Sequence, residues 1–169
     1  MSLMPIAPLA FPLYRPKLPH MNKPVIYIAS DHGGYTLKNQ FVAWMRENGY
    51  ELQDLGTHSE ERCDVSDYAI KMAEALKKDP NARGVLICKS GQASAMTANR
   101  YAHIRAALCT NTTMAHLARE HNDANVLVLG AIIIGAAVAQ ECLEVFLKTP
   151  CLGGRYAERV KMLTNLGGL

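Results

Sequence analysis

The amino-acid sequence predicts an α/β fold, a Rossmann-like three-layer sandwich in which helices cover both faces of a five-stranded parallel sheet. Short apolar runs alternate with helix-length amphipathic segments from Val25 onward. This repeated strand-helix order is typical of parallel strands joined by right-handed crossovers. The chain has 169 residues, a length that suits one domain with one core. In such folds, ligands bind at the carboxyl ends of the strands.

Hydrophobic periodicity predicts each element. In the first helix, Leu37, Phe41, Trp44 and Met45 share one face, and Gly49 follows as a stop signal. The apolar runs predict the strands in the same way. The expected strands are 25–29, 51–55, 84–88, 104–109 and 125–129, and the expected helices are 36–48, 67–77, 91–99, 113–120, 135–147 and 155–166.

The first 24 residues differ from the rest of the chain. Six of the eight prolines lie there, and no acidic residue does. Prolines at this spacing exclude a continuous helix or a central strand, so we expect a proline-rich extension over 1–24 and one folded domain over 25–169. The extension lacks the apolar run of a signal peptide, and no segment reaches the roughly 18 apolar residues of a membrane span. We therefore expect no membrane partner.

Composition narrows the possible functions. The net charge of +3 is too small to indicate a nucleic-acid partner. The odd number of cysteines argues against a closed disulfide framework, and their spacing contains neither a CxxC pair nor a metal-ligand pattern. We expect free thiols in a reducing cytoplasm and no bound metal. The five cysteines are Cys63, Cys88, Cys109, Cys142 and Cys151.

Polar residues follow three of the expected strands. Residues 30–34 read Ser-Asp-His-Gly-Gly, residues 88–91 read Cys-Lys-Ser-Gly, and residues 110–112 read Thr-Asn-Thr. All three loops can face one crevice, and the two glycines after His32 allow close approach of the backbone to an anion. Neither the G-x-G-x-x-G spacing of dinucleotide folds nor a P-loop lysine is present, which disfavours a nucleotide ligand.

Further polar groups lie elsewhere in the chain. Residues 121–125 read His-Asn-Asp-Ala-Asn, and Arg155 and Arg159 are spaced to share a helix face. Guanidinium groups suit phosphate oxygens. From the residues alone, however, Cys88 also fits a buried hydrophobe, His121 a helix-terminal cap, and the arginines a solvated face.

Together these motifs resemble the type B ribose-5-phosphate isomerase family, which includes galactose-6-phosphate isomerase subunits. The resemblance runs from about residue 25 to 161. It implies an aldose–ketose isomerase that needs no metal or other cofactor and works through an enediolate. It also implies a homodimer or homotetramer whose sites are completed by a neighbouring subunit. The motifs are residues 29–34, 86–88 with Ser90 and Gly91, 104–107, 117–127 and 153–155.

The resemblance also assigns roles to residues. Cys88 matches the base that moves a proton between C1 and C2, Ser90 the residue that assists it, and His121 the acid that opens the sugar ring. A base thiol benefits from nearby positive charge or N–H groups, and an imidazole exchanges protons near neutral pH. The substrate-binding residues implied are Asp31, His32 and Asn122, the loop residues Lys89, Gly91, Gln92 and Ala93, and the phosphate-binding Arg155 and Arg159.

The chain departs from the family pattern at several of these positions. Where the family usually reads Cys-Gly-Thr-Gly-Ile-Gly-Met-Ser, residues 88–95 read Cys-Lys-Ser-Gly-Gln-Ala-Ser-Ala. Ile132 stands where the family has a further phosphate-binding arginine, and residues 64–66 lack the usual Asp-Tyr-Pro. Lys89 either replaces the missing charge or acts on Cys88, and the sequence leaves both open.

Two classes of function follow. The first is an active isomerase of ribose 5-phosphate or of another sugar phosphate with four to six carbons. The second is a family member that binds a sugar phosphate or a partner without turnover, which the altered loop and Ile132 favour. Retention of both Cys88 and His121 favours the first. A redox protein using Cys88 is disfavoured because no resolving CxxC partner is present.

Overall fold

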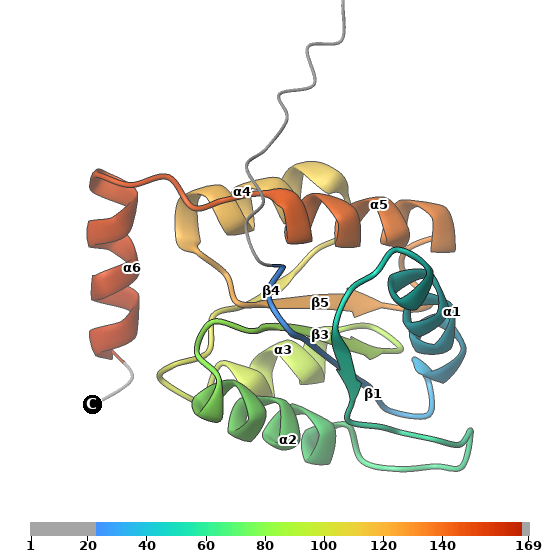
Figure 1. The fold of residues 1–169 in the computed structure, drawn as a ribbon. Helices are drawn as coiled ribbons and strands as arrows, with labels where there is room; N and C mark the ends of the chain where they lie inside the picture. The colour runs from blue at the N-terminus through green and yellow to red at the C-terminus, as the bar shows by residue number, and fades with distance from the viewer. Residues whose placement is uncertain (1–22, 167–169) are drawn as a thin grey trace, which may run out of the picture.

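A computed structural model describes residues 23–166 of the chain (Figure 1). Each expected strand and helix is present within this range. The proline-rich extension predicted over 1–24 lies almost wholly outside the described residues. In chain order the elements are β1 (Ile26–Ser30), α1 (Tyr35–Glu47), β2 (Leu52–Asp54), α2 (Val65–Lys78), β3 (Arg83–Cys88), α3 (Gln92–Ala98), β4 (Ala106–Leu108), α4 (Thr112–Asn122), β5 (Val126–Gly130), α5 (Ala136–Lys148) and α6 (Arg155–Leu166).

The sheet is parallel throughout, which confirms the predicted fold class. Its strand order is β2-β1-β3-β5-β4, and in the central part of the sheet Ile28 pairs with Val85, which pairs in turn with Leu127. The connections leave β1 toward one side of the sheet and β3 toward the other. The carboxyl ends of these two strands therefore form the topological switch point at which open α/β sheets bind ligands.

The sheet divides the apolar interior into two layers. Val85 and Ile87 of β3 face a cluster built with α1, α4 and α5, whereas Leu86 faces a second cluster built with α2 and α3. Figure 1 shows these helices on opposite faces of the sheet. The expectation of one core is therefore wrong, because a sheet covered on both faces has two buried interfaces.

Two edge strands are shorter than expected. β4 covers three residues rather than the six predicted, and β2 three rather than five. Before β4, the backbone N–H of Arg105 donates to the side chain of Asn125 at 2.8 Å instead of to a strand. At the other edge, the fully buried Lys38 of α1 forms an ion pair with Asp54 and ties β2 to the helix.

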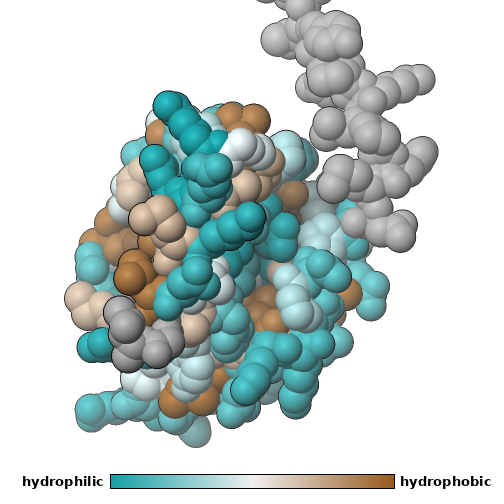
Figure 2. Space-filling view, turned by 90° about the vertical axis from the view of Figure 1, so that its left-hand side faces the viewer, coloured by the Kyte–Doolittle hydropathy of each residue, from teal (hydrophilic) through white to brown (hydrophobic). Residues whose placement is uncertain are grey.

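Helix α6 packs against α4 but buries none of its own residues. It stands at the side of the molecule in Figure 1, and Figure 2 looks onto this side, where apolar residues interrupt a hydrophilic surface. Met162, Leu163 and Leu166 of α6 are all exposed. This amphipathic helix therefore has an apolar face that the rest of residues 23–166 leaves exposed.

Candidate active site

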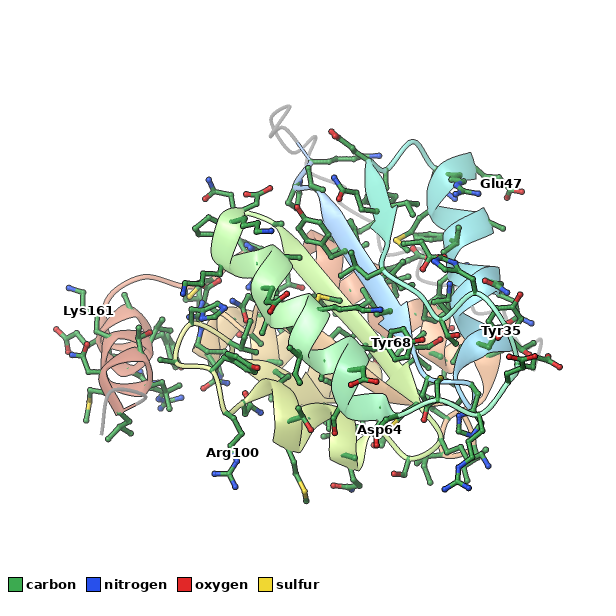
Figure 3. The ribbon with its side chains drawn as sticks, turned by 90° about the horizontal axis from the view of Figure 1, so that it is seen from below. Tyr35, Glu47, Asp64, Tyr68, Arg100 and Lys161 are labelled. Carbon is green, nitrogen blue, oxygen red and sulfur yellow. The ribbon has the colours of Figure 1, made fainter. Side chains whose placement is uncertain are left out.

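Backbone hydrogen bonds hold three loops together at the carboxyl edge of the sheet. The N–H of Asp31 donates to the carbonyl of Ile87 at 3.3 Å, and that of Ala131 donates to the carbonyl of Cys88 at 2.8 Å. The loops after β1, β3 and β5 are thus fixed side by side. Figure 3 shows Tyr35 and Tyr68 at this end of the molecule and Lys161 of α6 at the other.

Cys88 is the last residue of β3 and is 4% exposed. Its Sγ accepts a hydrogen bond of 3.0 Å from the backbone N–H of Gly91. Gly91 has a φ of +79°, and a Cβ there would meet Gly130 and Leu108, so glycine is the residue that suits this turn. The turn aims an N–H group at the sulfur, the group expected to carry negative charge in a thiolate base.

The rest of the Cys88 loop is more open. Ser90 is half-buried and accepts a long hydrogen bond of 3.4 Å from the N–H of Gln92, the first residue of α3. Gln92 and Ala93 are exposed, as is Lys89. The hydroxyl of Ser90 therefore lies within two residues of the sulfur and makes only weak contact with its own loop.

Asp31 and His32 follow the end of β1, beside the Cys88 loop. Asp31 is 8% exposed, and its Oδ1 accepts the N–H of Gly34 at 3.1 Å. His32 Nδ1 accepts the N–H of Cys63 at 3.4 Å. In the neutral ring this bond assigns the proton to Nε2, which makes Nε2 a hydrogen-bond donor for an anionic ligand.

The remaining predicted site residues lie at the amino ends of the strands, opposite Cys88. They are His121, Asn122, Arg155 and Arg159. His121 and Asn122 belong to the last turn of α4, which begins near the carboxyl ends of the strands and returns to their amino ends. This corrects the expected position of the two residues beyond the helix end. The two ends of the six-residue β3 are roughly 16 Å apart at the usual rise per residue. Within one chain, the structure therefore does not bring His121 to Cys88.

His121 belongs to a cluster with the start of α6. Its ring stacks on Tyr156 with 4.2 Å between centroids and 2° between planes, and its Nε2 lies 3.1 Å from Glu120. Arg155 donates to the hydroxyl of Tyr156 at 2.8 Å, and Arg159 lies 5.4 Å from the same ring. The hydrogen bond with Tyr156 raises the pKa of Arg155 above its usual value.

Two arginines hold the turn that carries His121 and Asn122. Asp123 has a φ of +44°, and its carboxylate accepts from Arg105 at 2.9 Å and from Arg119 at 2.7 Å. Arg105 also donates to the carbonyls of Asn122 and Asp123. Sequence reasoning assigned no role to these arginines or to Tyr156, although both arginines lie inside the resembling motifs.

No group of three or more metal-ligating side chains occurs in residues 23–166. Across the same range, no helix is both long and apolar enough to cross a membrane. All five cysteines are free thiols. The two clusters of polar residues, one at each edge of the sheet, are thus the groups available for chemistry.

Comparison with known proteins identifies the family. The sequence model of the ribose/galactose isomerase family matches residues 26–163. Ribose-5-phosphate isomerase B of Escherichia coli is 38% identical over 141 residues, covering 83% of this chain and 95% of its own. A putative sugar phosphate isomerase of Rickettsia conorii is 37% identical over 138 residues, covering 82% and 96%.

Comparison with solved structures points to the same family as the sequence comparison. Ribose-5-phosphate isomerase B of Clostridium thermocellum superposes with a TM-score of 0.83 at 42% identity, covering 85% of this chain and 97% of its own. The Mycoplasma genitalium enzyme, solved with bound ribulose-5-phosphate, superposes with a TM-score of 0.82 at 32% identity, covering 85% and 96%. The chain belongs to the ribose/galactose isomerase family and is an isomerase.

Proposed function

We propose that the protein interconverts an aldose phosphate and the corresponding ketose phosphate, with ribose 5-phosphate as the first candidate substrate. The observation that carries this proposal is Cys88, whose sulfur lies at the switch point of the sheet and accepts the N–H of Gly91. Asp31, His32 and Ser90 lie on the same two neighbouring loops. These residues suit a substrate with hydroxyl groups and one anionic end.

Proton transfer at Cys88 accounts for the reaction. The thiolate removes the proton from C2 of the open-chain aldose, and the C2–H electron pair forms the C1–C2 double bond while O1 becomes the oxyanion. The hydroxyl proton of O2 passes to O1, a transfer that Ser90 is placed to assist. Cys88 then returns its proton to C1, and the carbonyl forms at C2. The backbone N–H of Gln92, which makes only a long hydrogen bond to Ser90, suits the intermediate's negative charge.

Ring opening precedes this step and is the role proposed for His121, which protonates the ring oxygen as the anomeric hydroxyl loses its proton. Because His121 lies at the opposite edge from Cys88, a complete site requires a second copy of the chain. We propose a homodimer, alone or within a tetramer, in which the second copy supplies His121, Asn122, Arg155 and Arg159. The uncovered apolar face of α6 supports this assembly, because a dimer buries such a face.

Subunit mixing tests both the residues and the shared site. Cys88→Ala and His121→Ala should each abolish conversion of ribose 5-phosphate in a coupled assay. Mixing the two inactive variants after unfolding and refolding should restore about a quarter of wild-type activity, because each mixed dimer then holds one intact site. Full activity in Cys88→Ala would refute the role of Cys88 as the base. No recovery of activity on mixing would show that the site is not shared between two copies.

A non-catalytic role is the second candidate, and one observation favours it. Ile132, at the position of the expected arginine, is 73% exposed beside the Cys88 loop. A protein of this kind would bind ribulose 5-phosphate in calorimetry but show no turnover on ribose 5-phosphate or on a panel of four- to six-carbon aldose phosphates.

We also propose that the protein is located in the cytoplasm, which its five free thiols support.

A further inference from the structure

We propose that Lys89 provides the cation that binds the substrate's phosphate at the carboxyl edge, in place of an arginine at position 132. The inference rests on the proposed function and assigns a specificity-determining residue to its site. Lys89 follows the proposed base directly, and its side chain is exposed.

The stem of Lys89 lies flat across Gly33. A Cβ added at Gly33 would come within 3.1 Å of Cε and 3.2 Å of Cδ of the lysine and still closer to its Cγ. The absence of a side chain at Gly33 therefore leaves the channel in which the lysine lies. The lysine is thus directed from the Cys88 loop toward the turn that carries His32, where Nε2 is already a donor for an anion.

The ammonium group of Lys89 has no protein partner in residues 23–166, where it takes part in no ion pair and no hydrogen bond. The other lysine of this edge, Lys38, is fully buried and paired with Asp54. Lys89 is therefore a cation whose stem lies beside Gly33 and whose charge is available to a ligand. A phosphate oxygen is the partner that a point charge of this kind takes most readily.

Position 132 lies beside Lys89 in the fold. The backbone N–H of Ile132 donates to the carbonyl of Lys89 at 3.0 Å, so the segment after β5 runs alongside the segment after β3. Ile132 and Ile133 are 73% and 57% exposed and bring no charge to this edge. Of the two neighbouring positions 89 and 132, only position 89 thus has a positively charged side chain.

Moving the positive charge from position 89 to position 132 by mutation tests this inference. Lys89→Met should raise the KM for ribose 5-phosphate and weaken inhibition by inorganic phosphate roughly tenfold, as expected for loss of a charge-assisted hydrogen bond. Lys89→Met combined with Ile132→Arg should recover both values to within about threefold. Lys77→Met, which removes a lysine from the exposed end of α2, is the matched control and should change neither value.

A second variant retains the charge but displaces it. Gly33→Ala should push the stem of Lys89 out of its channel and raise the KM in the same direction. Light scattering on each variant checks that assembly is unchanged. An unchanged KM and phosphate inhibition in Lys89→Met would overturn the inference, as would a shift of the kcat pH profile without a change in KM, because Lys89 would then act on Cys88.

A binding measurement distinguishes failure of this inference from failure of the proposed function. If no sugar phosphate is turned over, calorimetry with ribulose 5-phosphate still compares the wild type with Lys89→Met. Loss of affinity in the variant supports Lys89 as the phosphate-binding residue even though the isomerase proposal has failed. Equal affinity in the two proteins overturns the role of Lys89 whether or not the enzyme is active.

Discussion

The cysteines of this chain show how surroundings decide what a thiol can do. Cys109 and Cys142 lie in the core formed with α4 and α5, and burial raises the pKa of Cys109 to about 12. Burial also raises the pKa of Cys142. Cys88 is nearly as buried, but it faces a turn that directs an N–H group at its sulfur. The residue type alone does not distinguish a core thiol from a base, whereas the contact of each sulfur does.

The raised pKa of Cys109 predicts a pH dependence of stability. The folded state keeps the proton between the ordinary thiol pKa near 9 and the folded value of about 12, whereas the unfolded state loses it. The stabilisation is therefore complete below pH 9 and falls as pH rises toward 12, by at most about 1.4 kcal/mol per pH unit. Urea titrations from pH 8 to 11 should show a smaller decline for Cys109→Val than for the wild type. Equal slopes would contradict the assignment.

At the scale of elements, α4 and the turn after it decide where His121 lies. The periodicity predicted a helix over 113–120, but Asn111 caps the helix one residue earlier and the Asp123 turn ends it two residues later. The side chain of Asn111 accepts the N–H of Met114 at 2.9 Å. The helix limits therefore depend on a cap and on an ion pair with Arg105, which is distant in sequence. Periodicity within the helix does not report such contacts.

Asp123 should be the residue on which this turn depends. Asp123→Ala removes the carboxylate acceptor of Arg119, which is 3% exposed and keeps only its carbonyl acceptors. The substitution also places a poorly suited residue at a φ of +44°. We expect a loss of about 2 kcal/mol in the free energy of unfolding together with a fall in kcat, because His121 is released.

Asp123→Asn and Asp123→Gly separate the two contributions to this effect. Asparagine tolerates the left-handed backbone and keeps an acceptor, whereas glycine keeps only the backbone freedom. The expected order of stability is wild type, Asn, Gly, Ala, measured by urea denaturation. A glycine variant as stable as the wild type would show that the carboxylate contributes nothing.

At the scale of the whole molecule, the sequence predicted the strands and helices but not the distance between the two groups of proposed site residues. Alternating apolar segments are local signals, so β1, β3 and β5 could be predicted from residue patterns alone. The strand order depends on pairings between distant segments such as β3 and β5, which local patterns do not contain. The placement of Cys88 and His121 at opposite ends of the strands follows from the parallel direction of β3 and β5, because Cys88 ends β3 whereas His121 lies in the last turn of α4, just before β5.

The assembly implied by this separation should depend on α6. Met162, Leu163 and Leu166 share one face of the helix at 100° per residue and are exposed in the single chain. Replacing Met162 and Leu163 with glutamate together should yield a monomer in light scattering and reduce kcat/KM at least about tenfold, because charges are disfavoured in an apolar interface. Thr164→Glu adds the same charge on the opposite side of α6 and should leave both the mass and the activity unchanged. A double variant that keeps the wild-type mass would show that α6 is not the interface, and an active monomer would show that one chain holds a complete site.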